Sequence, residues 1–299
     1  MIGPHVGRYY FSDDTSSKNE QDHNIPKMTI TQHIKGAIAE AKSFGYDVNF
    51  FQIFISGPQR LKLLLSDEEK DELRKFIRNK SEVPIKVIAH SAFAAYPWTG
   101  VPYPAIFIKK ELKVCRRAGL HGLVVHLGKQ DIPEVMKNIT NLMIDNCPLI
   151  YLETPSLKPE NSYYVKPKDI GLLFKFIKKF DPEFKYFGLC IDSAHLWTSG
   201  IDIQSYENAA AWLDEIMKQG IPTKNIIIHL NDSKTPIGSG IDQHAMLMKG
   251  LIWKSYIDSP KKSGLYAFLD FSYKYQIHII LERRIRDELI HDYCLLKSI

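Results

Sequence analysis

The chain has 299 residues, of which 44% are hydrophobic and 24% are charged, and its formal net charge is +5. This composition supports one large core or two small ones, and its apolar stretches fall short of the roughly 18 residues that a membrane span needs. The mild basicity is compatible with an anionic partner without requiring one, because it does not come from the charge runs of tails and arms.

Short apolar runs rich in β-branched residues recur along the chain and are typical of buried strands. Helix-like stretches separate them, such as residues 31–44, which end before Gly45, and residues 66–79, which open with the capping sequence SDEE. In chain order, strands are predicted at residues 2–6, 49–55, 84–90, 122–127, 148–153, 186–192, 225–230 and 276–282. Helices are predicted at residues 31–44, 66–79, 103–118, 132–145, 168–180, 205–219 and 262–275, with a closing helix at 286–299.

The regular alternation of strand and helix predicts a parallel sheet. Eight repeats within 299 residues fit a (β/α)8 TIM barrel better than an open sheet. We therefore expect an α/β fold in which residues 1–299 form a single domain. The polar segment SDDTSSKNEQDHNIPK at residues 12–27 predicts a mobile loop after the first strand.

Side chains that bind divalent metals follow most of the predicted strands. In a barrel of parallel strands the carboxyl ends converge on one face, and that face carries the active site. Residues from distant parts of the sequence are therefore expected in one pocket, with chemistry suited to metal ions. The set is His90, His126, Glu153, Asp192, His195, His229, Asp242, His244 and Glu282.

Several of these positions also have a structural interpretation. Asp192 and His195 stand three residues apart after one strand and could serve two adjacent metals. A lone histidine at a strand end, however, is more often a hydrogen-bonded core or surface residue. The glycines of the segment GSGIDQH permit a tight loop in which Asp242 and His244 chelate one ion, and an ordinary polar turn is the alternative.

Glu153 and Glu282 each end an apolar run, where a lone carboxylate is costly unless it is paired or bound to a metal. Asp232, three residues after His229, fits a loop cap better than a carboxylate that orients the imidazole. Five histidines and four carboxylates exceed the roughly four ligands of one tetrahedral zinc, so the set suits two or three ions. Such clusters hydrolyse phosphate esters. No GxxxxGK[ST], GxGxxG or GxSxG motif occurs, so no nucleotide cofactor is expected.

The motifs together resemble a known family. The segments AHSAF, VVHLG, YLETP, CIDSAHLWTSG, IIIHLND, GSGIDQHA and IILER are similar, in order and over essentially the whole chain, to those of endonuclease IV, the metal-dependent apurinic/apyrimidinic (AP) endonuclease family. The LETP and HLG variants and the Lys-rich character resemble most the enzymes of large cytoplasmic DNA viruses. The resemblance implies a TIM barrel with three zinc ions, with manganese as an alternative at one or more sites.

The resemblance also assigns ligands and a reaction. A first ion would be held by His90, His126 and Glu153, a second by Glu153, Asp192, His229 and Glu282, and a third by His195, Asp242 and His244. Catalytic roles fall to the bridging Glu153 and to Glu282, which would orient the nucleophile. The implied reaction cleaves the DNA phosphodiester 5′ to an abasic site and leaves a 3′-hydroxyl and a 5′-deoxyribose phosphate. Family members also repair blocked 3′ ends, and some are 3′→5′ exonucleases.

The DNA contacts rest on weaker patterns. Phe93 stands where the family often has tyrosine, so it could stack on DNA without donating a hydrogen bond. Gln59 or Arg60 would replace the family's DNA-probing arginine, and Gln243 stands in place of a common arginine, which removes one phosphate contact. Further candidates at the pocket rim are Lys249, Tyr96, Trp98 and Lys254.

Two other interpretations stay open. A sugar isomerase or epimerase on a xylose-isomerase-like barrel would also use strand-end Glu, Asp and His with one or two ions, but it would not need Asp242 and His244. A catalytically dead DNA-binding barrel is disfavoured by the intact ligand set. The expected partner is double-stranded DNA that contains abasic sites, with no membrane, and the expected oligomeric state is a monomer.

The four cysteines form no CxxC pair, and the first residues MIGPHVGRYY lack the pattern of a signal peptide. A reducing compartment is therefore expected, with the cytoplasm as the location. A virus factory, a virion or the nucleus would leave the same pattern.

Overall fold

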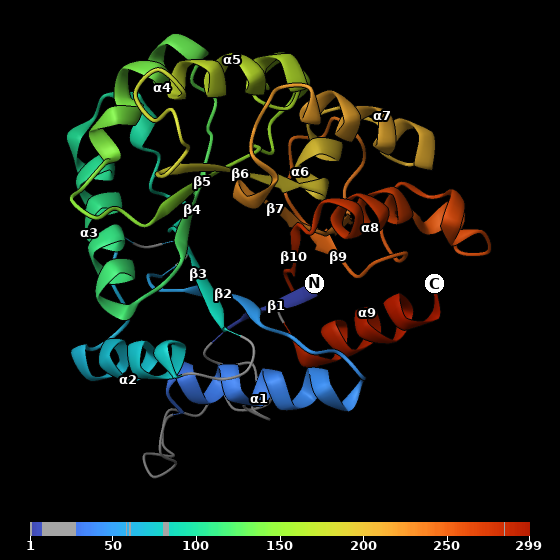
Figure 1. Cartoon of the computed structure of the whole chain (residues 1–299). Coiled ribbons are helices and arrows are strands. Elements are labelled where there is room, and N and C mark those ends of the chain that lie inside the picture. Colours follow the sequence, from blue (N-terminus) through green and yellow to red (C-terminus); the bar gives the residue numbers. More distant parts are fainter. Residues whose placement is uncertain (1, 8–27, 58, 60, 80–83, 284) are drawn as a thin grey trace.

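The computed structural model describes residues 2–7, 28–57, 59, 61–79, 84–283 and 285–299. Eight parallel strands close into a barrel in the order β1-β10-β7-β6-β5-β4-β3-β2. Figure 1 shows the long helices as a ring around these strands, in chain order. The predicted (β/α)8 TIM barrel is therefore confirmed. The predicted loop at residues 12–27 and the candidate Arg60 lie outside the described residues, and the single-domain assignment stays a prediction.

All eight predicted strands are present, and each begins and ends within two residues of its expected bounds. The reason is that their short apolar runs are buried between the barrel interior and the surrounding helices. They are β1 (Ile2–Val6), β2 (Phe50–Phe54), β3 (Lys86–His90), β4 (Gly122–His126), β5 (Leu149–Glu153), β6 (Phe187–Asp192), β7 (Ile226–His229) and β10 (His278–Leu281).

The outer helices also follow the expected order. α2 begins with the capping box predicted from SDEE, in which Ser66 and Glu69 satisfy each other's backbone N–H groups. The eight are α1 (Ile30–Ser43), α2 (Asp67–Arg78), α3 (Pro102–Ala118), α4 (Ile132–Ile139), α5 (Pro167–Ile177), α7 (Tyr206–Met217), α8 (Gly264–Tyr275) and α9 (Arg286–Ser298). Within the described residues, no helix combines the length and apolarity that a bilayer crossing requires.

The predicted helix at 132–145 is too long, since α4 ends at Ile139. Asn138 donates side-chain hydrogen bonds to the carbonyl groups of Glu134 and Trp98, and the chain then tightens into a 3-10 turn. Elements that were not predicted are α6 (Ser193–Thr198), the paired strands β8 (Asp232–Ser233) and β9 (His244–Ala245), and the 3-10 turns η1 (Pro97–Thr99), η2 (Thr140–Leu142), η3 (Pro159–Asn161), η4 (Thr223–Asn225), η5 (Lys254–Tyr256) and η6 (Pro260–Lys262).

Toward the carboxyl ends of the strands, two successive layers of side chains fill the barrel interior. Seven strands each contribute one residue to a separate apolar cluster of Phe50, Ile88, Val124, Tyr151, Cys190, Ile227 and Ile280. Because strand side chains alternate, the residue two positions later projects to the same side. Each of those positions is polar, and β1 adds a histidine, so the carboxyl ends of the eight strands carry one polar layer: His5, Gln52, His90, His126, Glu153, Asp192, His229 and Glu282.

Candidate metal centre

The polar layer opens into a cavity of about 630 Å³ at the carboxyl ends of the strands. Seven of the nine predicted ligands line this cavity: His90, His126, Glu153, His195, Asp242, His244 and Glu282. The other two, Asp192 and His229, are fully buried next to them. The barrel therefore brings together all nine residues that the sequence singled out, from segments spread over almost 200 positions.

Glu153 lies at the centre of the cluster. One carboxylate oxygen, Oε2, is 2.8 Å from His126 Nε2 and 3.1 Å from His90 Nε2. The other, Oε1, is 2.7 Å from His229 Nδ1. The β4–β5 register, which pairs His126 with Glu153, sets this arrangement. The carboxylate thus faces histidines on two sides, as a ligand that bridges two cations would.

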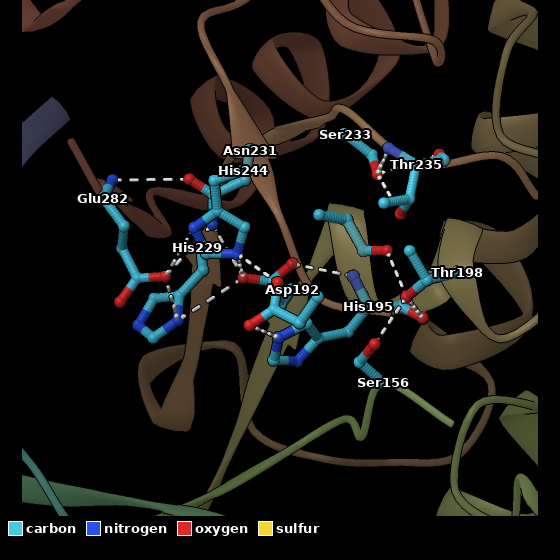
Figure 2. A network of polar contacts seen from close by, with 12 residues as sticks. Ser156, Asp192, His195, Thr198, His229, Asn231, Ser233, Thr235, His244 and Glu282 are labelled. Carbon is cyan, nitrogen blue, oxygen red and sulfur yellow. Dashed lines mark hydrogen bonds and ion pairs between the residues drawn. The ribbon is translucent and has the colours of Figure 1, made fainter. Parts of the chain in front are cut away.

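Two of the predicted ligand groups are compact. The donor atoms of His90, His126 and Glu153 all lie within 4.8 Å of one another, and so do those of Glu153, Asp192, His229 and Glu282. In the second group, His229 Nδ1 is 3.4 Å from Glu282 Oε2 and 3.8 Å from Asp192 Oδ2, and Figure 2 shows these side chains pointing toward one another. Imidazole and carboxylate donors at this spacing suit zinc or manganese.

The third group is built by a helix cap and a turn. Asp192 ends β6 and caps α6 by accepting the N–H of His195 at 2.9 Å, which explains the spacing of three residues. His195 Nε2 is 3.3 Å from Asp242 Oδ2, and His244 Nε2 is 2.9 Å from Asp242 Oδ1. The turn before Asp242 uses positive φ at Gly238 and Gly240, as the glycine-rich segment predicted.

Hydrogen bonds from the ring nitrogens orient three of the imidazoles. His90 Nδ1 donates to the carbonyl of Ser91 at 2.8 Å, and His195 Nδ1 donates to that of Thr154 at 2.7 Å. His229 Nε2 is 2.8 Å from the side-chain oxygen of Gln52. With one nitrogen committed as a donor, the other faces the carboxylates, where it can hold a proton or give its lone pair to a metal ion. A metal-binding histidine requires this orientation.

Closely spaced, buried carboxylates and histidines determine the pKa values in the metal centre. Burial by itself would lower the pKa of His90, but the hydrogen bond and charge of Glu153 raise it to about 9. The pKa of His195 is likewise raised against the effect of burial, by Asp192 and Asp242. Burial opposes ionisation of Glu282, yet the neighbouring histidines His229 and His244 bring its pKa down to about 2. The site therefore favours bound positive charge, which protons or metal ions can supply.

A second set of side chains holds the carboxylates, and it was missed by the sequence reasoning. Asn231 donates through Nδ2 to Asp192 at 2.7 Å and to Glu282 at 3.1 Å. The buried Arg283 donates to Asn231 Oδ1 at 2.8 Å and forms an ion pair with the buried Asp292 of α9. Gln52 and His5 were missed as well. The strand alternation could have revealed them, because each is the next inward-facing residue of its strand after the level of the apolar layer.

Two structural roles are settled by the geometry. Asp232 accepts backbone N–H groups from Ser233, Gly250 and Ile252, so the expected loop cap is confirmed. Trp98 was placed at the rim, but it is fully buried and its indole donates to the carbonyl of His126, so that assignment was wrong. The large indole ring of Trp98 is more stable when it packs beneath the loop that follows β3 than when it is exposed to water.

The predicted DNA-contact residues are distributed unevenly. Gln59, Phe93 and Gln243 line the cavity, and Phe93 is 39% exposed. Its ring stacks on His126 with centroids 5.5 Å apart. Lys249 is exposed but is not among the residues lining the cavity. Their roles in DNA binding stay predictions, as do the ligand roles of the nine residues above.

Comparisons with known proteins agree with these motifs. The sequence model of the family described as Xylose isomerase-like TIM barrel matches residues 38–270. A probable AP endonuclease of African swine fever virus (isolate Warthog/Namibia/Wart80/1980) is 36% identical over 267 residues, 88% of each chain. A probable endonuclease 4 of Mycoplasmopsis pulmonis is 29% identical over 218 residues, which cover 68% of this chain and 75% of that protein.

Solved structures extend the comparison. The crystal structure of AsfvAP:AG superposes with a TM-score of 0.85 at 33% identity and covers 100% of this chain and 98% of that one. Endonuclease IV from Thermus thermophilus has a TM-score of 0.69 at 19% identity, covers 100% and 99% of the two chains, and supports the fold alone. The chain therefore belongs to the endonuclease IV group of the xylose isomerase-like TIM barrel family, as its motifs predicted.

Proposed function

We propose that this protein is an AP endonuclease of base-excision repair. It would hydrolyse the DNA phosphodiester 5′ to an abasic site, with double-stranded DNA as its partner. The observation that carries the proposal is the third group, in which Asp242 lies between His195 and His244 beside the Glu153-centred cluster. The printed names of the viral and mycoplasmal relatives support the same activity.

The donor set fits three divalent ions, with zinc as the proposed metal. His90, His126 and Glu153 would hold one, Glu153, Asp192, His229 and Glu282 a second, and His195, Asp242 and His244 a third. When bound, such ions lower the pKa of a water and neutralise charge that develops on phosphate oxygens.

The chain's own residues supply orientation and proton handling. Glu282 is held by the side-chain amides of Gln52 and Asn231, and its side chain is 15% exposed toward the cavity. A carboxylate fixed in this way can accept a hydrogen bond from the attacking water and keep it in line with the phosphorus. Glu153 and Glu282 are therefore the proposed catalytic carboxylates.

The rim of the cavity supplies apolar surface for a distorted duplex. Phe93 and Tyr96 are 39% and 40% exposed, and both follow β3 beside the metal centre. An abasic nucleotide costs less to extrude than a normal one because no base is stacked, and an aromatic ring can fill the space that it leaves.

The test uses a duplex with one tetrahydrofuran abasic analogue, labelled at its 5′ end. The chelated protein should be inactive, and zinc or manganese should restore a cut immediately 5′ to the lesion. Glu282→Gln should abolish cleavage, whereas the matched variant Glu207→Gln, on the exposed start of α7, should not. Near-normal turnover by Glu282→Gln would contradict the mechanism. Absence of cutting by folded, metal-loaded protein, together with turnover of an aldose, would favour a sugar isomerase instead.

A further inference from the structure

His5 and Gln52 complete the polar layer of the barrel without an assigned role. They lie on the adjacent strands β1 and β2, paired in register, and their side chains are almost wholly buried. His5 belongs to none of the candidate metal groups that the described residues form. Both nevertheless contact the centre, because Gln52 lies against His229, Glu282 and His5 at the same time.

The chemistry of Glu282 fixes which way the Gln52 amide points. One end of the amide is 2.6 Å from Glu282 Oε1, and the same end is 3.0 Å from His5 Nδ1. An ionised carboxylate only accepts hydrogen bonds, so this end must be the NH2 group, Nε2. The opposite end, 2.8 Å from His229 Nε2, is then the oxygen.

This orientation determines where both histidines carry their proton. The Gln52 oxygen only accepts, so His229 must donate from Nε2. Its Nδ1 faces Glu153 and Glu282, where it donates a proton to Glu153 at 2.7 Å in the metal-free chain or gives its lone pair to a metal ion. The second N–H of Gln52 is directed at His5 Nδ1, which must accept. A neutral His5 therefore carries its proton on Nε2.

The Nε2 atom of His5 has no hydrogen-bond partner among the described residues, and His5 lines the cavity. The ring is held by Phe54, with centroids 4.5 Å apart. A neutral N–H donor beside a metal centre suits an anionic oxygen, since it binds the anion without adding a charge that would repel the metal ions.

We propose that Gln52 is a positioning residue that sets the tautomers of His229 and His5, and that His5 Nε2–H donates a hydrogen bond to a phosphate oxygen of the substrate. The first half concerns the chain alone. The second half rests on the proposed function, because it takes a DNA phosphate as the ligand of this site.

The tautomers can be read by long-range ¹H–¹⁵N NMR on zinc-loaded protein with labelled histidine. His5→Phe identifies the His5 resonances, and His121→Phe serves as the matched control because His121 is exposed in the bend before β4. We expect His5 and His229 to be protonated at Nε2 and the His5 Nε2 resonance to move when inorganic phosphate is added. A His5 proton on Nδ1, or a resonance that phosphate leaves unmoved, would overturn the proposal.

Two further variants separate the roles. Gln52→Met keeps the volume but removes both hydrogen-bonding ends, and it should weaken zinc affinity roughly 10- to 100-fold in a chelator competition. His5→Phe should leave zinc affinity unchanged and lower kcat/KM on the abasic duplex roughly tenfold or more, the scale of one hydrogen bond to a charged acceptor. Equal kcat/KM for His5→Phe and the His121→Phe control would overturn the substrate contact. A wild-type protein that responds to phosphate at His5 but does not cut the duplex would support this inference and contradict the proposed function.

Discussion

Arg283 donates a hydrogen bond to the side-chain oxygen of Asn231 at 2.8 Å, and this contact decides how the carboxylates of the centre are held. With its oxygen occupied by a cation, the amide must direct its NH2 group at Asp192 and Glu282. Arg283 is in turn neutralised by Asp292, so a helix at the end of the chain supports the metal centre.

Replacing Asn231 with leucine should therefore destabilise the fold. Leucine has a similar shape but leaves Asp192 and Arg283 with buried, unsatisfied groups, at a cost of about 2–4 kcal/mol in the free energy of unfolding. Urea denaturation of the metal-free protein measures this. The matched control is Asn208→Leu on the exposed part of α7, where a change within about 0.5 kcal/mol is expected. Equal stability of the two variants would mean that the network does not hold the centre.

The pH dependence of stability should differ between metal-free and metal-loaded protein. The folded-state pKa of His90, about 9, is above its ordinary value of 6.5, so its protonation stabilises the metal-free fold fully below pH 6.5 and ceases to do so as the pH rises through 9. The pKa of Glu282, about 2, is below its ordinary 4.5, so its contribution is present above pH 4.5 and is lost as the pH falls through 2.

Metal binding reverses the effect of pH through His90, because an imidazole that binds a metal ion must be neutral. The difference in Tm between zinc-loaded and metal-free protein should therefore widen from pH 6 to pH 9, by roughly 5 °C or more. Calorimetry on desalted samples measures this difference. A gap that stays constant over this range would show that protons and metal ions do not compete for these histidines.

The fold could be predicted almost completely from the sequence, because the signals that define most of its strands and helices lie within a few neighbouring residues. Each strand is a short, mostly apolar run with at least one β-branched residue, and a signal such as the Ser66 capping box marks where a helix begins. The prediction was wrong at the end of α4, because the side chain of Asn138 reaches Trp98, 40 positions earlier in the chain. A contact of that kind leaves no periodic pattern in the sequence.

The site was predictable where residue type carries the chemistry. Histidines and carboxylates at strand ends point to metal ions by themselves. Gln52 and Asn231 have no such signature, and Gln52 acts on His229, 177 positions away. The place of Gln52 in its strand predicts that it faces inward, but its contacts become visible only when the barrel brings the strands together.

The third metal group yields a prediction about stoichiometry. Asp242 contacts both His195 and His244, and among the described residues these two histidines also form a compact group with Asp192. Asp242 itself belongs to none of the compact groups, so Asp242→Asn should remove the ion of the third group selectively. Bound zinc should fall from about three to about two per chain, and cleavage should fall roughly 10²–10³-fold. Elemental analysis and the abasic-duplex assay measure the two effects.

Asp258→Asn, in an exposed turn, is the matched control and should change neither quantity. Loss of all metal in Asp242→Asn would contradict the prediction that the three groups bind their ions separately. Unchanged zinc content with full activity would remove the observation that distinguishes the nuclease from a two-ion isomerase.

Phe93 should act on the substrate rather than on the metal. Its ring is exposed at the rim, so Phe93→Ala should lower kcat/KM on the abasic duplex roughly 5- to 100-fold, the usual effect of losing one aromatic contact to DNA. Phe93→Tyr keeps the ring and should retain activity. Steady-state kinetics on the labelled duplex make the comparison, with Tyr273→Ala, an 82% exposed residue of α8, as the unaffected control.

The same ring also stacks on His126, so a loss of activity could arise through that imidazole. Zinc content separates the two causes. If Phe93→Ala binds as much zinc as the wild type and only its KM rises, the ring contacts DNA. If zinc is lost and kcat falls, the ring acts by holding His126 in place, and the DNA-contact assignment is wrong.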